Sequence, residues 1–319
     1  MNRVKLWLVG FLGVVLLFLG ACTTVGEKQA EILKPPVVAP GAEYVGTKTC
    51  LECHDDLSED AKTNVHLRLA NYEVPGGSVK GCEACHGPGS KHEEAMENDN
   101  TEAGLKAIIR FGKGKLEGKR ASAVCLTCHS GGETMHYTFS AHFENDVACT
   151  DCHKIHGNKR KALLAKPEFK LCGSCHQDIR ARFYLSSHHP VREGHMYCSD
   201  CHNPHGTDNP IPGMLRTEER LNDLCLSCHT RYQGPFVFEH EPVVENCTIC
   251  HEPHGTIANN LLKKNEPFLC TECHNVHFHA TKLGGWTRGM LTKCTQCHKY
   301  VHGSNLPSQP LSGNKALMR

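Results

Sequence analysis

Residues 149–157 read CTDCHKIHG, and this stretch holds the feature that decides the fold: two cysteines, two residues apart, followed at once by histidine. The same Cys-x-x-Cys-His spacing occurs ten times and uses twenty of the twenty-one cysteines of the 319-residue chain. In chain order, the cysteine pairs of motifs 1 to 10 are Cys50/Cys53, Cys82/Cys85, Cys125/Cys128, Cys149/Cys152, Cys172/Cys175, Cys198/Cys201, Cys225/Cys228, Cys247/Cys250, Cys270/Cys273 and Cys294/Cys297.

Thiols at this spacing can form thioether bonds to the two vinyl groups of one haem, and the adjacent imidazole then binds the iron. A single copy would also suit zinc or thiol redox chemistry. Ten unbroken copies favour haem over zinc or disulfides, and they predict ten covalently attached haems of the c type. The predicted proximal ligands are His54, His86, His129, His153, His176, His202, His229, His251, His274 and His298.

The supply of further ligands indicates what the haems do. Fourteen histidines remain for ten irons, whereas only six methionines follow Met1. Two histidine ligands per iron give a closed, low-potential electron carrier, and an open position would admit a substrate. We therefore expect electron transfer and no enzymatic activity. The alternative is a multihaem reductase of a small nitrogen or sulfur oxyanion with one open haem, and a third possibility is an extracellular cytochrome filament.

A longer repeat underlies the motif repeat. His142 precedes motif 4 by the same interval at which His240 precedes motif 8, and both motifs continue with a histidine three residues on and then glycine. These later histidines, His156 and His254, together with His205 after motif 6, are too close to their own motif to reach the opposite face of the same haem. We expect them to bind the haem of a neighbouring motif.

The remaining cysteine, Cys22, lies at the end of an export signal. Arg3 and Lys5 precede an apolar segment, and the sequence Leu-Gly-Ala-Cys resembles the lipobox at which bacterial lipoproteins are cleaved and acylated. A plain cleaved signal or an uncleaved anchor is the alternative, although the apolar segment is short for a membrane span. We predict a signal peptide over 1–21, a lipidated tether over 22–43, a decahaem domain over 44–302 and a tail over 303–319.

Composition predicts the fold class. Hydrophobic residues make up 39% of the chain, and it contains 29 glycines and 16 prolines, which is a poor supply for an aliphatic core. Haems packed closely along an elongated chain can replace that core, with short helices, irregular loops and little or no β-structure around them. The net charge of +1 gives no indication of nucleic-acid binding.

Several stretches resemble the MtrA/DmsE family of decahaem cytochromes. They are GCEACHGP at 81–88, FGK at 111–113, DVAC at 146–149, SDCHNPHG at 199–206, ENC at 245–247 and VHGSN at 301–305. The resemblance covers about residues 44–308 and implies one distal histidine per haem, while His136, His188, His195 and His277 have no counterpart. The implied distal ligands are His66, His92, His142, His156, His189, His205, His240, His254, His279 and His302.

The same resemblance implies a periplasmic electron conduit inserted in an outer-membrane β-barrel porin. Its partners would be that porin, a periplasmic or inner-membrane cytochrome as donor, and an extracellular multihaem cytochrome or terminal reductase. Well-known members resemble soluble periplasmic proteins, whereas this chain carries Cys22 in a lipobox. Thr23 rather than Asp follows that cysteine, which favours a lipid anchor at the outer membrane over one at the inner membrane.

Overall fold

The computed structural model describes residues 33–68, 73–74, 77–78, 81–157, 159–209, 211–217, 219–274, 293–296 and 298–306. The predicted signal peptide, Cys22, His277, His279, Cys297 and residues 307–319 lie outside these ranges. None of the helices described is long and apolar enough to cross a membrane.

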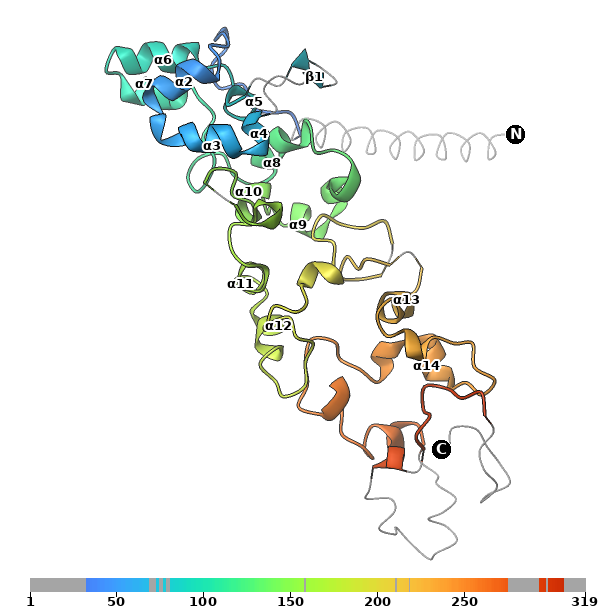
Figure 1. Cartoon of the computed structure of the whole chain (residues 1–319). Coiled ribbons are helices and arrows are strands. Elements are labelled where there is room, and N and C mark those ends of the chain that lie inside the picture. The colour runs from blue at the N-terminus through green and yellow to red at the C-terminus, as the bar shows by residue number, and fades with distance from the viewer. Residues whose placement is uncertain are drawn as a thin grey trace, which may run out of the picture. The chain divides into compact units, whose positions relative to one another are not determined.

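The described chain consists of short helices joined by irregular segments (Figure 1). This confirms the predicted fold class, because a motif every few tens of residues leaves little room for longer elements. Its β-structure is one two-residue hairpin, β1 (Glu73–Val74) with β2 (Gly77–Ser78). The α-helices are α2 (Thr47–Cys53), α3 (Ser58–Thr63), α4 (Val65–Arg68), α5 (Glu83–His86), α6 (Ser90–Glu97), α7 (Thr101–Lys106), α8 (Gly118–Leu126), α9 (Ala141–Glu144), α10 (Cys149–Cys152), α11 (Glu168–Cys172), α12 (Gln177–Arg182), α13 (Leu221–Leu226) and α14 (Glu241–Glu245).

Single 3₁₀ turns supply the other helical segments. They are η1 (Asp55–Leu57), η3 (Gly132–Thr134), η4 (Tyr137–Phe139), η5 (Lys161–Leu163), η6 (Cys198–Asp200), η7 (Thr230–Tyr232), η8 (Cys247–Ile249), η9 (Asn259–Leu261), η10 (Cys270–Glu272) and η12 (Cys294–Gln296).

The chain divides into two compact units, residues 1–166 with motifs 1 to 4 and residues 167–319 with motifs 5 to 10. The first eight motifs alternate in local structure, whereas the odd motif 9 lies in a single 3₁₀ turn, η10, like the even motifs. The odd motifs 1, 3, 5 and 7 have their first cysteine in a helix that begins upstream of the motif, namely α2, α8, α11 and α13. The even motifs 2, 4, 6, 8 and 10 lie in a single turn: α5, α10, η6, η8 and η12.

A polar side chain joins each odd motif to the even motif that follows it. Thr47, Ser122 and Asn222, three residues before the first cysteine of motifs 1, 3 and 7, accept hydrogen bonds from the backbone N–H of Cys82, Cys149 and Cys247 at 3.4, 3.2 and 2.7 Å. Glu168 and Glu266, four residues before motifs 5 and 9, accept from the backbone N–H of Ser199 and Thr295 at 2.6 and 2.8 Å.

We call these five side chains the clamp residues, and each odd motif with its following even motif a motif pair. An N–H group at the start of a helical turn has no partner within that turn, so a side-chain acceptor stabilises it, by about 1 kcal/mol for a typical cap. Here the acceptor comes from the preceding motif. The clamp therefore fixes two predicted haem-attachment motifs against each other as one structural element.

The even motifs 4, 6 and 8 are followed by the same return loop. In each, the chain comes back to pair with the motif histidine, in the bridges His153–Leu164, His202–Leu215 and His251–Leu262. The residue before each leucine has a left-handed backbone, with φ between 53° and 57° at Leu163, Met214 and Leu261. The sequence repeats at these places as ALLA at 162–165, GMLR at 213–216 and NLLK at 260–263.

Conventional core is scarce, as the composition predicts. The buried apolar side chains described are five alanines and six larger residues. In the first unit Ala121 and Val124 of α8 lie buried near Tyr137 and Phe143, whose rings meet edge to face at 5.5 Å. So small a core leaves the haem as the main apolar component of the folded chain.

Candidate haem sites

Seven pairs of imidazole rings face each other across a gap of constant width. Two imidazoles on opposite sides of one metal ion are separated by two metal–nitrogen bonds of about 2 Å and by two centroid-to-nitrogen distances of about 1.1 Å in a ring of ordinary C–N bonds. Their centroids are then roughly 6 Å apart. The seven observed separations lie between 5.9 and 6.5 Å.

Other ring contacts span a wider range, from 4.3 Å between Tyr232 and His302 to 6.5 Å between His229 and Tyr232. Each of the seven pairs joins one predicted proximal histidine with one predicted distal histidine. The pairs are His54–His92, His86–His156, His129–His66, His202–His254, His229–His189, His251–His302 and His274–His240. The gap fits an iron atom bound on both sides, so we propose these pairs as the ligand sets of motifs 1, 2, 3, 6, 7, 8 and 9.

The pairing crosses between motifs that are not consecutive. His156, which follows motif 4, faces His86 of motif 2, and His254, which follows motif 8, faces His202 of motif 6. The sequence-based expectation that these histidines face another motif agrees with the geometry, although the partner lies two motifs back.

The two units repeat one ligand arrangement. His66, shortly after motif 1, faces motif 3, and His189, shortly after motif 5, faces motif 7. Motifs 1 to 4 therefore correspond to motifs 5 to 8, and each unit contains this four-motif arrangement within itself.

Hydrogen bonds determine which nitrogen of these imidazoles is free for iron. The Nδ1 atoms of six predicted iron ligands, five from the facing pairs and His153 of motif 4, lie 2.6–2.9 Å from backbone carbonyl oxygens. A carbonyl only accepts, so Nδ1 carries the proton and Nε2 is left with its lone pair. The donor–acceptor pairs are His86–Ile109, His92–Gly104, His153–Ala162, His189–Pro253, His202–Gly213 and His251–Asn260.

The return loops supply three of these acceptors, at Ala162, Gly213 and Asn260. Their left-handed residues turn the carbonyl toward the ring, which explains why the ALLA-type sequence recurs after motifs 4, 6 and 8. The Nδ1 of His66, by contrast, is buried with no hydrogen-bond partner.

Burial keeps several of these imidazoles neutral. It lowers the pKa of His66, His86, His251, His254 and His302 below the ordinary histidine value, and neighbouring histidines lower it further. Neutral imidazole is the form that binds a metal. The environment therefore favours ligation at neutral pH.

Histidines 188 and 189 are adjacent in the sequence, and the structure gives them different roles. His189 faces His229, while both ring nitrogens of His188 are used, Nδ1 with the carbonyl of Leu185 at 2.6 Å and Nε2 with Glu193 at 3.3 Å. This geometry favours His189 as the ligand. The distal ligands of motifs 4, 5 and 10 stay a prediction, with His142, His205 and His279 as the candidates that the resemblance implies.

The first cysteines of each motif pair lie side by side. Thiols hydrogen-bond between Cys50 and Cys82, Cys125 and Cys149, Cys172 and Cys198, and Cys225 and Cys247. In the last motif pair the thiols of Cys270 and Cys294 and a carboxylate oxygen of Glu266 lie within 4.8 Å of one another. Thioether bonds at these positions would hold two porphyrin edges together in every motif pair. These cysteines are predicted haem-attachment residues, so the Glu266 cluster is no separate metal site.

The second cysteines of the odd motifs differ from the other described motif cysteines, a distinction that the uniform spacing does not predict. The polypeptide leaves five of them exposed, namely Cys53, Cys128, Cys175, Cys228 and Cys273, whereas the remaining described motif cysteines are half-buried. The histidines that follow these five are exposed as well: His54, His129, His176, His229 and His274.

This exposure distinguishes the two cysteines of each odd motif. Each first cysteine of an odd motif is covered on one side by its clamped neighbour. Cys128, Cys228 and Cys273 instead lie near the second cysteines of the preceding even motifs, Cys85, Cys201 and Cys250, and stay exposed. Exposed thiols are accessible to reaction, and an apolar porphyrin bonded to them would supply the cover that the small aliphatic core does not. The five residues therefore stay predicted attachment sites.

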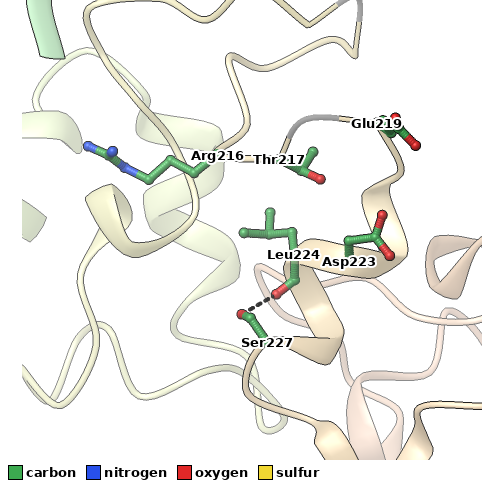
Figure 2. A pocket seen from close by; sticks show the side chains of 6 residues that line it. All are labelled: Arg216, Thr217, Glu219, Asp223, Leu224 and Ser227. Atoms are coloured by element: carbon green, nitrogen blue, oxygen red, sulfur yellow. Dashed lines mark hydrogen bonds between the residues drawn. The ribbon is translucent and has the colours of Figure 1, made fainter. Parts of the chain in front are cut away.

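One open pocket of about 370 Å³ lies beside motif 7 (Figure 2). Its walls come from the segment before α13 and from α13 itself, where the Ser227 hydroxyl donates to the carbonyl of Leu224 at 2.7 Å. Among the residues that the structure describes, the lining contains no histidine or cysteine, so these residues offer no imidazole or thiolate ligand to iron. Its lining residues are Arg216, Thr217, Glu219, Asp223, Leu224 and Ser227.

Two carboxylates act on distal ligands, and sequence reasoning did not single them out. Asp60 Oδ2 accepts a hydrogen bond from His156 Nδ1 at 3.0 Å, and Glu252 Oε1 accepts from His254 Nδ1 at 3.2 Å. A carboxylate in this place makes the imidazole a stronger electron donor and stabilises the oxidised metal. Asp60 lies far from His156 in the sequence, so only the fold shows the pair.

Replacing Asp60 by Asn should raise the reduction potential of the haem at motif 2. The Asp60 side chain is only 14% exposed, so water screens its charge little. We expect a rise on the order of 60 mV, since 59 mV corresponds to a tenfold change in a one-electron equilibrium. Spectropotentiometric titration of the holoprotein measures it. Glu59→Gln removes the same charge from a side chain that is 82% exposed and paired with Lys62, and it should leave the curve unchanged. Equal shifts in both variants would contradict the assignment.

Comparison with known proteins gives three findings. The family model described as a doubled CXXCH motif matches residues 141–181, 188–234 and 240–278. These windows join motifs 4 and 5, 6 and 7, and 8 and 9, so they are displaced by one motif from the motif pairs of the structure. The chain is 36% identical over 284 residues to the multihaem cytochrome MtrA of Shewanella baltica (strain OS185), covering 83% of this chain and 80% of the relative.

Among solved structures, an undecahaem cytochrome from the S-layer of Carboxydothermus ferrireducens aligns over 73% of this chain and 34% of its own length. The sequence identity is 18% and the TM-score is 0.13, so this alignment supports no structural argument.

Proposed function

The chain belongs to the MtrA-type multihaem c-type cytochromes, which are electron-transfer proteins, and we propose that it conducts electrons between the periplasm and the cell exterior. Ten bis-histidine haems would carry the charge. The supporting observation is the constant gap of about 6 Å between seven pairs of imidazoles, because an iron closed on both sides exchanges electrons and binds no substrate.

Each group of residues has a distinct part in this proposal. The cysteines hold the porphyrins covalently, and the histidines bind the iron from both faces. The haem itself supplies one-electron redox chemistry. The clamp residues and the adjacent first cysteines bring haems into close pairs, and close spacing is what electron transfer along a chain requires.

The location of the protein is part of the same proposal. A lipid on Cys22 would hold the N-terminus at the periplasmic face of the outer membrane, followed by the tether over 22–43. The decahaem domain over 44–302 would then enter a β-barrel porin and meet an extracellular multihaem cytochrome or terminal reductase on the far side. A periplasmic or inner-membrane cytochrome would supply or receive the electrons within the cell.

Electron transfer across a liposome membrane tests this proposal. The full-length holoprotein is purified from outer membranes together with any porin that accompanies it, and its intact mass gives the number of haems and the lipid. Liposomes containing a reduced viologen and this complex should reduce ferric citrate added outside, while liposomes with the porin alone or the cytochrome alone should not. A cytochrome that copurifies with no barrel protein and gives no transmembrane reduction would overturn the conduit.

A further inference from the structure

In the second unit the clamp residues differ in charge from one motif pair to the next. Glu168 clamps motifs 5 and 6 with two contacts, from Ser199 N–H at 2.6 Å and Ser199 O–H at 3.1 Å. Glu266 clamps motifs 9 and 10 in the same way, from Thr295 N–H at 2.8 Å and Thr295 O–H at 2.9 Å. Motifs 7 and 8, between them along the chain, are clamped by the neutral amide of Asn222.

Both glutamates use their two oxygens as acceptors from an N–H and an O–H, which is the arrangement that an ionised carboxylate makes. For Glu266 the structure fixes the distance as well, because a carboxylate oxygen lies within 4.8 Å of the sulfurs of Cys270 and Cys294. These sulfurs are the points at which the two porphyrins of the motif pair would be attached. The charge is therefore placed beside both haems.

The residues between the motif cysteines add little to this difference. Motif 6 contains Asp200, and the Glu272 carboxylate of motif 9 is ion-paired with Lys264. Motif 7 has Leu226 and Ser227, and motif 8 has Thr248 and Ile249. The nearest acidic residue in α13, Asp223, is ion-paired with Arg220 at 2.8 Å on the surface. Glu245 lies two residues before motif 8 and Glu252 directly after it, so the difference between the motif pairs rests on the clamp residues themselves.

A negative charge near a haem stabilises the ferric form, which has one more positive charge than the ferrous form, and so it lowers the reduction potential. We propose that Glu168 and Glu266 are positioning residues that lower the potentials of the haems at motifs 5, 6, 9 and 10, an effect that the neutral clamp residue Asn222 does not exert at motifs 7 and 8. This inference rests on the haem attachment proposed above but requires neither the porin nor the direction of electron flow.

Charge-neutral, nearly isosteric variants test the inference on the full-length holoprotein. Glu168→Gln and Glu266→Gln keep an oxygen acceptor for the N–H group and lose only the charge. Each should move the low-potential part of a spectropotentiometric titration upward by about 59 mV for the haems of its own motif pair, which corresponds to a tenfold change in a one-electron equilibrium constant. Glu102→Gln is the control, since Glu102 is 81% exposed, paired with Lys106 and remote in sequence from every motif.

The haem content of each variant distinguishes a loss of haem from an unchanged reduction potential. Intact mass counts the attached haems, and the low-spin spectrum counts those that are six-coordinate. If both glutamine variants keep all haems and titrate like the parent protein, the inference is overturned while the conduit proposal stands. If Glu168→Gln loses haem, Glu168→Asp keeps the charge and one acceptor. Recovery of haem content and low potential in that variant supports the role of the charge, and a loss equal to that of Glu168→Gln overturns it.

Discussion

Replacing His254 by Ala converts one low-spin haem to a high-spin haem. His254 faces His202 of motif 6 with ring centroids 6.0 Å apart and nearly parallel planes, and no other described histidine ring is found opposite His202. The variant should show a high-spin ferric signal from one haem by electron paramagnetic resonance, and the reduced protein should bind carbon monoxide at that haem only. An open iron position of this kind is what the reductase alternative needs, so the parent protein should show neither signal.

The matched control is His195→Ala. His195 has no counterpart among the ligands that the resemblance implies, and its side chain is exposed. This variant should keep every haem low-spin. A His254→Ala protein that also stays fully low-spin would show that another residue binds the iron at motif 6. The pairing read from the ring geometry would then be wrong at this site.

Replacing Gly255 by Ala should unfold the region around motifs 5 to 8. A methyl group at this position would lie 2.2 Å from the carbonyl oxygen of Arg182, which is backbone and cannot turn away, and the backbone φ of 151° is one that residues with side chains rarely adopt. Overpacking costs typically 1–3 kcal/mol and backbone strain on the order of 1–3 kcal/mol. We therefore expect the free energy of unfolding to fall by roughly 3 kcal/mol or more.

The damage would extend to iron ligation, because residues 182–187 and 254–256 are held together on both sides of the glycine. Ser187 and Thr256 exchange N–H···O bonds of 3.0 and 2.8 Å, and His189 donates to the carbonyl of Pro253. Denaturant unfolding and the high-spin fraction measure both effects. Gly157→Ala is the control at the equivalent place after motif 4, where φ is 64° and nothing lies within 4 Å of an added methyl group. That variant should lose only about 1 kcal/mol, and equal losses would refute the steric argument.

The elements whose chemistry is local could be predicted from the sequence. The Cys-x-x-Cys-His spacing by itself suits two thiols and one imidazole to the same haem, so the attachment residues and proximal ligands could be predicted from spacing alone. The surplus of histidine over methionine predicted the kind of distal ligand. Glycine after His156, His205 and His254 was visible as a repeat, and all three of these glycines have a positive φ between 64° and 151°.

The pairing of ligands could not be predicted, because it depends on how the chain folds back. Nothing in the spacing of His86 and His156 indicates that the rings face each other, and the contact arises only when α3 and the segment after motif 4 are brought together through Asp60 and Asn64. The clamp residues were missed for another reason. A Ser, Asn, Thr or Glu three or four residues before a helical cysteine has the composition of an ordinary helix start, and only the N–H group that it meets, in the following motif, reveals its role.

The unequal exposure of the motif cysteines has the same origin. Ten identical spacings carry no sign of which thiols the polypeptide covers, and the difference between Cys125, beside Cys149, and the exposed Cys128 follows from the packing of α8 against α10. Contacts between motifs, rather than the motif itself, therefore decide how each attachment site is enclosed.

Some irons would bind a histidine that occurs later in the chain than their own motif, and this sets the order in which the haems acquire their second ligand. A secreted polypeptide emerges with its N-terminus first, so the iron at motif 2 would wait for its second ligand until His156 has crossed the inner membrane, and the iron at motif 6 would wait for His254. Motifs 3 and 7 face histidines that have already emerged, His66 and His189. A chain that is only partly exported would thus carry haems at motifs 2 and 6 with one open, reactive iron position. The positions would be filled once the histidine that follows the fourth motif of each group, His156 or His254, has crossed the membrane.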